Sequence, residues 1–400
     1  MLIDNNNEIA MSKLLLAICL SMCLIACTDA KDTSYVENMQ PSYDFSTADQ
    51  WLEDFVRDEA TFDGASLIVV HKDWGVLYVQ SYGTHSTDMV YMLASVSKVP
   101  SVSLLMAMDA DPDLDFDIDT TVENYLPWMT AYPGVTTADM LSNTSGIPGL
   151  LVVFNGGYGA HTCQYAAPGQ FANADNLLTC GQTIYETPLA GTIAPGTAFD
   201  YGGSQWQLAG AVAETVGGDS WANLFNKYIA EPCSLDVYEF GNMFANTAAW
   251  NGFPDSLIGQ ENPNIEGGAI SNLEDVSTLL RMHLNDGKCG DNQVMPPASA
   301  QRMRTDVGSA LGSREWVGDG RGYGLGWWIP LTEEGVEPSL FQDGGAYGSV
   351  TWIDTDRDYA VFVALAEYGN IIAARRGPQR IVPEFTPVMD EIMDAAQLKP

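Results

Sequence analysis

A serine and a lysine three residues apart, Ser95 and Lys98, are the residues of this sequence best suited to covalent chemistry. On a helix, side chains at this spacing lie on the same face, about 5–6 Å apart at Cβ. A serine hydroxyl is a poor nucleophile at neutral pH, and a lysine can remove its proton only if burial or nearby positive charge lowers the pKa of the ammonium. The apolar neighbours Ala94, Val96 and Val99 favour burial. The pair predicts a serine nucleophile with a lysine base, and an ordinary helix start with a surface lysine is the alternative.

Other catalytic and metal-binding patterns are missing from the sequence. It has no G-x-S-x-G motif, and no motif links a histidine to a serine. The acidic run from Asp111 to Asp119 lacks the glycine and the glutamate of an EF-hand loop. No C-x-x-C pair is present, so a zinc site is not expected. We therefore expect a reaction that needs neither a metal nor an organic cofactor. The histidines, scattered along the chain, are His71, His85, His161 and His283.

The secondary structure expected around this pair changes along the chain, from strands near both ends to helices between them. Residues 66–70 and 76–82 form two β-rich runs around a glycine-containing turn, and residues 349–354 and 359–366 form another pair around an acidic turn. Between these ends, apolar residues recur at helical spacing. The sequence therefore predicts an α+β fold in which an antiparallel sheet, formed by N- and C-terminal strands, is flanked by helices and carries an inserted, mostly helical lobe. The expected helices cover residues 96–108, 137–141, 206–216, 220–229, 273–284 and 385–398.

Two features bear on the surroundings of Ser95. Pro100 cannot sit in a regular helix interior without the loss of a hydrogen bond, so the helix must begin near Ser95 or be distorted there. Residues 149–195 form a long irregular stretch, which we expect to border the active site. In an oxidising compartment, Cys163–Cys180 and Cys233–Cys289 would be the pairing with the shortest loops among three possible connectivities.

The N-terminus and the charge indicate where the protein acts. Residues 1–27 are predicted to be a signal peptide that ends in a lipobox-like Leu-Ile-Ala-Cys, with Cys27 as the lipidated residue; an ordinary cleaved signal is the alternative. Residues 28–44 are an expected tether, and residues 45–400 an expected hydrolase domain. The formal charge of −35 would repel phosphate backbones and anionic membrane surfaces, so nucleic acid is excluded as a partner. We expect an exported bacterial protein, periplasmic or on the cell surface, that meets the membrane only through its lipid.

Five further stretches follow Ser95 and Lys98 in an order and at a spacing typical of one family. Over roughly residues 60–370 the sequence resembles the serine β-lactamases, penicillin-binding proteins and related esterases, and it is most similar to their class C β-lactamase-like branch. The stretches are MLSNTSG (140–146), PGTAFDY (195–201), GGAISNLED (267–275), YGLGW (323–327) and GGAYGS (344–349).

The resemblance implies roles for individual residues. Tyr201 stands where the family has a tyrosine that faces the serine as a base or proton shuttle, and a phenol near cations loses its proton more easily; a buried structural aromatic is the alternative. The backbone N–H groups of Ser95 and Ala346 match the family's oxyanion hole. Gly344 and Gly345 would permit close approach to a substrate.

Two positions depart from the family pattern. Gly203 replaces the asparagine of the common Tyr-x-Asn, whose amide would touch a substrate amide. Asp343 replaces the cation of the Lys-Thr-Gly or His-x-Gly motif, which the resemblance places on the edge strand of the sheet. A negative Asp343 would disfavour an anionic substrate group by about 1–4 kcal/mol at 4 Å. Neutral or cationic acyl substrates are therefore expected in place of β-lactams.

Taken together, the sequence predicts an exported serine hydrolase that cleaves an ester or amide bond through an acyl-enzyme on Ser95. Its expected partner is a small ester or amide, or a peptide derived from peptidoglycan. The alternatives are a catalytically silent penicillin-binding or peptidoglycan-binding lipoprotein on the same scaffold, a D-alanyl-D-alanine carboxypeptidase, or a β-lactamase.

Overall fold

The computed structural model describes residues 41–126, 128, 132–150, 176–186, 191–242, 247–312 and 321–398. The predicted signal peptide with Cys27 and most of the tether lie outside the described residues. The chain divides into two units, and the larger, Asp44–Asp394, contains Ser95 and Lys98. In the smaller unit, β1 (Pro41–Ser42) pairs antiparallel with β14 (Gln397–Leu398). Along the described segments, no helix combines the length and the apolar character that a membrane crossing requires.

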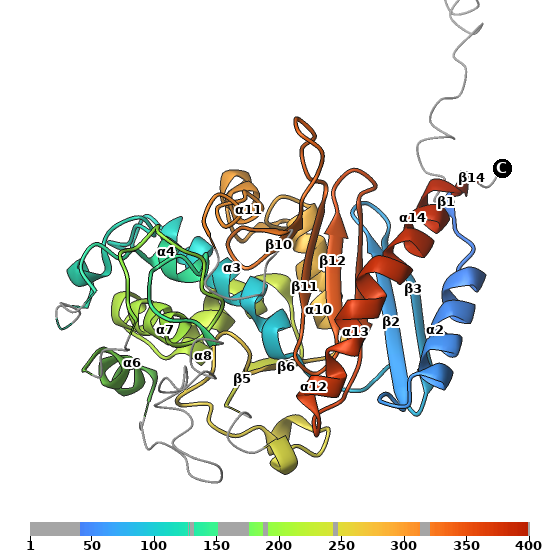
Figure 1. Cartoon of the computed structure of the whole chain (residues 1–400), viewed down its shortest axis with the longest axis horizontal. Helices are drawn as coiled ribbons and strands as arrows, with labels where there is room; N and C mark the ends of the chain where they lie inside the picture. The colour runs from blue at the N-terminus through green and yellow to red at the C-terminus, as the bar shows by residue number, and fades with distance from the viewer. Residues whose placement is uncertain are drawn as a thin grey trace, which may run out of the picture. The chain divides into compact units, whose positions relative to one another are not determined.

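A seven-stranded antiparallel sheet organises the larger unit (Figure 1). Its strand order, β3-β2-β13-β12-β11-β10-β9, places the N-terminal hairpin directly beside the C-terminal strands. The central strands β2 and β13 are buried almost throughout, and accordingly they are continuous apolar runs rather than alternating ones. The predicted α+β fold is confirmed. The strands are β2 (Gly64–His71), β3 (Gly75–Gly83), β9 (Arg321–Tyr323), β10 (Trp328–Pro330), β11 (Leu340–Gly344), β12 (Val350–Asp354) and β13 (Tyr359–Ala364).

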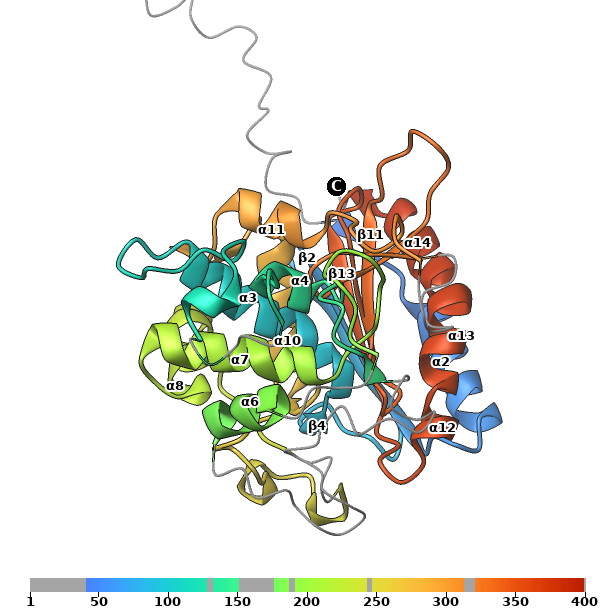
Figure 2. The same ribbon diagram turned by 60° about the vertical axis from the view of Figure 1, so that its left-hand side comes forward.

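Helices cover both faces of this sheet. In Figure 2, α2, α13 and α14 lie on one face, whereas α10 packs on the other face and separates the sheet from the helical region that contains α3, α4, α6, α7 and α8. The α-helices are α2 (Ser46–Asp58), α3 (Lys98–Asp109), α4 (Thr137–Leu141), α6 (Leu177–Glu186), α7 (Ser204–Gly217), α8 (Trp221–Phe225), α9 (Glu231–Cys233), α10 (Leu273–Leu284), α11 (Pro297–Met303), α12 (Ile371–Ala374), α13 (Arg376–Arg380) and α14 (Thr386–Asp394).

Shorter elements complete the unit. A three-stranded sheet has the order β4-β6-β5, and its strands stand among the helices in the sequence, between β3 and β9. Its strands are β4 (Tyr91–Met92), β6 (Ala269–Ser271) and β5 (Tyr238–Phe240); β7 (Lys288–Cys289) and β8 (Asn292–Gln293) form a separate hairpin. The 3₁₀ turns are η2 (Ala94–Ser97), η3 (Val122–Asn124), η6 (Thr247–Ala249) and η7 (Pro254–Ser256), and the π turns are η4 (Asn226–Ala230) and η8 (Ile381–Phe385).

Local capping explains why some helix boundaries match the sequence-based ones. Helices α4 and α10 have the predicted bounds, because Thr136 and Asn272 accept hydrogen bonds from backbone N–H groups of their first turns. Helix α2 was missed, although it buries an apolar face that includes Leu52 and Phe55. The predicted helix 220–229 is α8 followed by a π turn, and of residues 385–398 only Thr386–Asp394 are α-helical.

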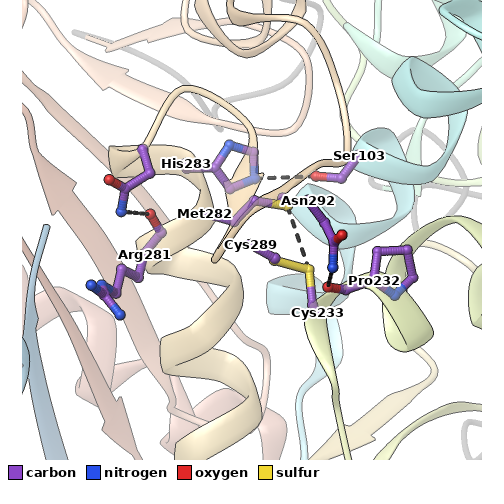
Figure 3. Close-up of a disulfide and its surroundings, with 9 residues drawn as sticks. Ser103, Pro232, Cys233, Arg281, Met282, His283, Cys289 and Asn292 are labelled. Carbon is purple, nitrogen blue, oxygen red and sulfur yellow. Dashed lines mark hydrogen bonds between the residues drawn. A yellow bond between two sulfur atoms is a disulfide. The ribbon is translucent and has the colours of Figure 1, made fainter.

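A disulfide ties the short helix α9 to strand β7. Figure 3 shows Cys233 bonded to Cys289, with Met282 beside them. Figure 3 also shows the hydrogen bond between His283 and Ser103, whose Nε2 and Oγ atoms are 3.1 Å apart. The Ser103 hydroxyl donates to a backbone carbonyl, and both side chains are buried. We therefore interpret this contact as structural. Cys180 is also disulfide-bonded, and Cys163 lies outside the described residues.

Removal of the Cys233–Cys289 bridge by a double serine substitution should destabilise the protein. The bridge joins residues 56 apart, and closure of such a loop stabilises the fold by about 4 kcal/mol through restriction of the unfolded chain. Urea unfolding of the oxidised proteins measures the difference. The same comparison in reducing buffer is the control, because the gap between wild type and variant should shrink there; equal stability of the oxidised forms would contradict the prediction.

Candidate active site

Ser95 lies in the 3₁₀ turn η2, which connects strand β4 to helix α3. The preceding Ala94 has a φ of 46°, an uncommon conformation for a residue with a Cβ atom, and its side chain is buried. The α-helix begins at Lys98, so Pro100 falls in its first turn, where backbone N–H groups lack an α-helical acceptor. The expected distortion near Ser95 is therefore a 3₁₀ turn that leads into the helix.

The amine of Lys98 is buried and is surrounded by three acceptors. Its Nζ lies 3.2 Å from Ser95 Oγ, 3.0 Å from the carbonyl oxygen of Glu266 and 3.3 Å from Glu266 Oε2. The Lys98 side chain is 1% exposed. An ammonium has three N–H donors, so each of them has an acceptor here. This geometry holds the amine against the hydroxyl that it would have to activate.

The charge state of Lys98 differs from the sequence-based expectation. Burial lowers its pKa, but the electrostatic effects of Tyr201, Glu266 and Asp343 and a hydrogen bond with Tyr201 raise it, and the net direction is upward from the ordinary lysine value. The expectation that burial would move the pKa toward neutrality was therefore wrong for the resting site, because these polar neighbours outweigh desolvation. At neutral pH the amine is an ammonium.

Tyr201 lies against the same amine. The Lys98 Nζ is 4.5 Å from the centroid of the Tyr201 ring, which stacks on Trp328 at 5.2 Å and meets Tyr323 edge-on. Burial raises the pKa of Tyr201, while the charge of Lys98 and hydrogen bonds with Ser95 and Lys98 lower it less. The phenol is thus not acidified as the sequence suggested. It is placed to share a proton with Ser95 and Lys98.

The MLSNTSG stretch positions the turn that carries Tyr201. Asn143 Oδ1 accepts hydrogen bonds from the backbone N–H of Gly202 and from Trp206 Nε1, both at 2.8 Å. The backbone N–H of Leu150 donates to the Tyr201 carbonyl at 2.8 Å. Because these groups are buried, the loss of Asn143 Oδ1 would leave two donors unsatisfied. The stretch therefore supports the tyrosine.

The loop between β11 and β12 approaches the other side of Ser95. A Cβ atom at Gly345 would lie 2.4 Å from the carbonyl oxygen of Leu93, so only a glycine permits this approach. Ala346 packs in a small apolar cluster with Ala94, next to Ser95. The strand assignment implied by the resemblance needs correction: β11, which carries Asp343 and Gly344, pairs with both β10 and β12, and the edge strands of this sheet are β3 and β9.

Asp343 lies in the site but differs electrostatically from the expectation. Its side chain is 1% exposed, and burial raises its pKa well above the usual range, against the opposing effects of Lys98 and of the Gly344 N–H. One oxygen, Oδ1, accepts a hydrogen bond from Gly344 at 2.9 Å, and the buried Oδ2 has no partner among the described residues. Burial therefore disfavours a negative charge on Asp343. Its carboxyl group does not supply the family's cation.

The structure adds residues that sequence reasoning missed. Glu266 directly precedes the recognised GGAISNLED stretch, yet no local pattern marks it as a partner of Lys98, 168 residues away. Ser97 and Ser101 bind the same segment: Ser97 Oγ accepts from the Ala269 N–H at 3.0 Å, and Ser101 Oγ donates to the Ile265 carbonyl at 2.6 Å. The serine-rich start of α3 is thus anchored to residues 265–269.

Metal chemistry finds no support in the described part of the chain. Within those segments no group of three or more histidine, cysteine, aspartate or glutamate side chains is placed to hold an ion. The site consists of a hydroxyl, an amine, a phenol and two carboxyl groups.

Comparison with known proteins assigns this arrangement to a family. The family described as "Beta-lactamase" matches residues 48–380. The chain belongs to the beta-lactamase family of serine hydrolases. Penicillin-binding protein 4 of Amycolatopsis lactamdurans is 26% identical over 354 residues, which are 80% of this chain and 85% of that protein.

Solved structures share the fold of this beta-lactamase family member. A candidate beta-lactamase from Bacteroides dorei DSM 17855 superposes with a TM-score of 0.69 at 22% identity, covering 88% of this chain and all of the other. EstCE1, a hydrolase with promiscuous acyltransferase activity, has a TM-score of 0.61 at 19% identity, covering 83% of this chain and 98% of its own. The resemblance read from the sequence is confirmed.

The raised pKa of Lys98 predicts an alkaline activity profile. The free amine can accept the Ser95 proton, and its fraction grows as the pH rises toward the Lys98 pKa. The kcat/KM for p-nitrophenyl butyrate should therefore increase between about pH 7 and pH 9. Subtraction of the rate of a Ser95→Ala variant corrects for spontaneous hydrolysis, and a flat corrected profile would contradict the assignment of the base.

Proposed function

We propose that this chain is an exported hydrolase that cleaves small esters or amides through an acyl-enzyme on Ser95. The observation that carries the proposal is the 3.2 Å contact between Ser95 Oγ and the buried Lys98 amine. The described hydrolase and acyltransferase activities of EstCE1 support an ester as the substrate class. The proposal assigns the remaining groups of the site to proton transfer and to stabilisation of the oxyanion.

In the proposed reaction, Ser95 Oγ attacks the carbonyl carbon of the substrate. Its proton passes to the free amine of Lys98, directly or through the Tyr201 hydroxyl, and then to the leaving group. The backbone N–H groups of Ser95 and Ala346 would stabilise the negative charge of the tetrahedral intermediate. Water then attacks the acyl carbon, the bond between that carbon and Ser95 Oγ breaks, and the same groups pass a proton from the water to Ser95 Oγ as the acid product leaves. The apolar and aromatic neighbours of Lys98 exclude bulk water from the amine.

The proposed substrates are uncharged near the scissile bond. Where the family has a cation, this chain has the buried Asp343, on which burial disfavours a negative charge and which offers no positive charge to a substrate carboxylate. Gly203 provides no side-chain amide for a substrate amide. Both features favour neutral esters over β-lactams and over peptides with a free carboxylate.

A second candidate function has one observation in its favour. The relative named penicillin-binding protein 4 supports a D-alanyl-D-alanine carboxypeptidase or β-lactamase, or a silent protein that binds peptidoglycan peptides. A substrate panel separates these candidates from the esterase.

A fluorophosphonate probe followed by peptide mass spectrometry tests the nucleophile. We expect label on Ser95, none in Ser95→Ala and full labelling in the exposed control variant Ser86→Ala. Lys98→Ala and Tyr201→Phe should lower p-nitrophenyl ester turnover by about 10²–10⁴-fold. Ester turnover that survives in Ser95→Ala would overturn the proposal.

Substrate preference is measured in the same preparation. The kcat/KM for neutral p-nitrophenyl esters should exceed the values for a chromogenic cephalosporin and for a D-alanyl-D-alanine peptide. The reverse order would favour the penicillin-binding alternative.

Lipid anchoring through Cys27 is also part of the proposal and rests on the lipobox-like sequence alone. Cells that express the full chain should incorporate labelled palmitate into it, and a Cys27→Ser variant should not. Equal labelling of both proteins would contradict the anchor, whereas export could still proceed through an ordinary signal peptide.

A further inference from the structure

A buried carboxylate contacts the amine of the site in addition to Ser95. The Glu266 side chain is 3% exposed, its Oε2 lies 3.3 Å from Lys98 Nζ, and its own backbone carbonyl accepts from the same nitrogen at 3.0 Å. One residue thus provides two of the three acceptors around the ammonium. A buried ammonium without such partners would be strongly disfavoured.

The carboxylate is itself fixed by the turn after Tyr201. The backbone N–H of Gly203 donates to both carboxylate oxygens, at 3.0 Å and 2.9 Å. Gly203 has φ 89° and ψ −153°, and a Cβ atom at the neighbouring Gly202 would lie 2.6 Å from Glu266 Oε2. The two glycines therefore give the carboxylate its place beside Lys98. Gly203, which stands where the family has an asparagine, thus belongs to the same arrangement as Glu266, because its backbone N–H holds the Glu266 carboxylate.

We propose that Glu266 is a positioning residue for the serine–lysine pair: its carboxylate and its carbonyl fix the Lys98 amine against Ser95 and balance the charge of the buried ammonium. The inference rests on the proposed function, since it assumes that Ser95 and Lys98 react. Glu266 acts on the substrate only through Lys98.

The other groups that face Lys98 do not duplicate this role. Tyr201 contacts the amine with its ring and also forms a hydrogen bond with it, but it brings no carboxylate; the ring centroid of Trp206 lies 5.4 Å from Nζ. Asp343, on β11, influences Lys98 electrostatically, but its side chain accepts a hydrogen bond from the backbone N–H of Gly344. Glu266 combines a charge contact with a hydrogen bond to the amine.

This placement has two opposing consequences for the reaction. The negative carboxylate makes it harder for Lys98 to lose the proton that it must shed before it can accept another from Ser95. The same contacts keep the nitrogen in line with the hydroxyl. Without the charge, the free amine would form at lower pH, but it would be held less well. A residue that only supported the fold would not produce this pair of effects.

The Glu266→Gln variant tests the inference, because it removes the charge and keeps the shape. We expect the alkaline plateau of kcat/KM for p-nitrophenyl butyrate to fall about 100-fold, with most of the loss in kcat. The acidic limb of the profile should move to lower pH by about one unit or more. Glu333→Gln, which removes the same charge from an exposed loop, is the matched control and should leave the profile unchanged.

A second variant covers the case in which Glu266→Gln fails to fold, as monitored by circular dichroism. Glu266→Asp keeps the charge but withdraws the carboxylate from Lys98 by one methylene. It should lower kcat and shift the limb in the same direction by a smaller amount.

The possible outcomes distinguish a failure of the role of Glu266 from a failure of the proposed function. A wild-type profile with an acidic limb and Ser95 labelling, combined with an unchanged profile in the folded Glu266 variants, would overturn the role of Glu266 alone. A fall in kcat with no shift of the limb would also overturn it. Absence of Ser95 labelling in the wild-type protein would overturn the proposed function itself.

Discussion

The site depends on the burial of one ammonium. Removal of a charged amine from water costs several kcal/mol unless partners replace its hydration, and Lys98 finds three acceptors, one on Ser95 and two on Glu266. Two of these come from a segment 168 residues further along the chain. The start of α3 and residues 265–269 must therefore pack together before the amine is satisfied. Hydrogen bonds of Ser97 and Ser101 to that segment act in the same direction. The serine-rich helix start is thus tertiary support for the nucleophile as well as its local frame.

Glycines at two turns let the remaining groups approach this centre. Gly345 brings the β11–β12 loop against the backbone just before Ser95, and Gly202 and Gly203 make room for the carboxylate of Glu266. Larger residues at these points would push the loops apart. The departures from the family pattern at positions 203 and 343 leave the contact between Ser95 and Lys98 in place, since Glu266 contacts the Lys98 amine and the Gly203 N–H holds the Glu266 carboxylate. Neither position carries the amide or the cation of the family pattern, since Gly203 has no side chain and Asp343 is a buried carboxyl group.

Two carboxyl groups near one amine have different surroundings. Glu266 is hydrogen-bonded by the Gly203 N–H and paired with Lys98, whereas the buried Asp343 accepts from Gly344 and has a second oxygen without a partner in the described chain. The pKa of Asp343 is accordingly raised by burial. The site therefore combines a contact between Lys98 and Glu266 with a second carboxyl group on which burial disfavours a charge.

The sequence by itself determined the fold class, the nucleophile candidates and those helices whose ends carry local signals, as the bounds of α4 and α10 show. These properties follow from periodicity and capping, which act within a few residues. The tertiary structure decided the rest: that Glu266 meets Lys98, that β11 is an interior strand, and that Asp343 is buried and has a raised pKa. It also reversed the expected direction of the Lys98 pKa. These features arise from contacts between distant segments and from the exclusion of water, neither of which leaves a pattern along the chain.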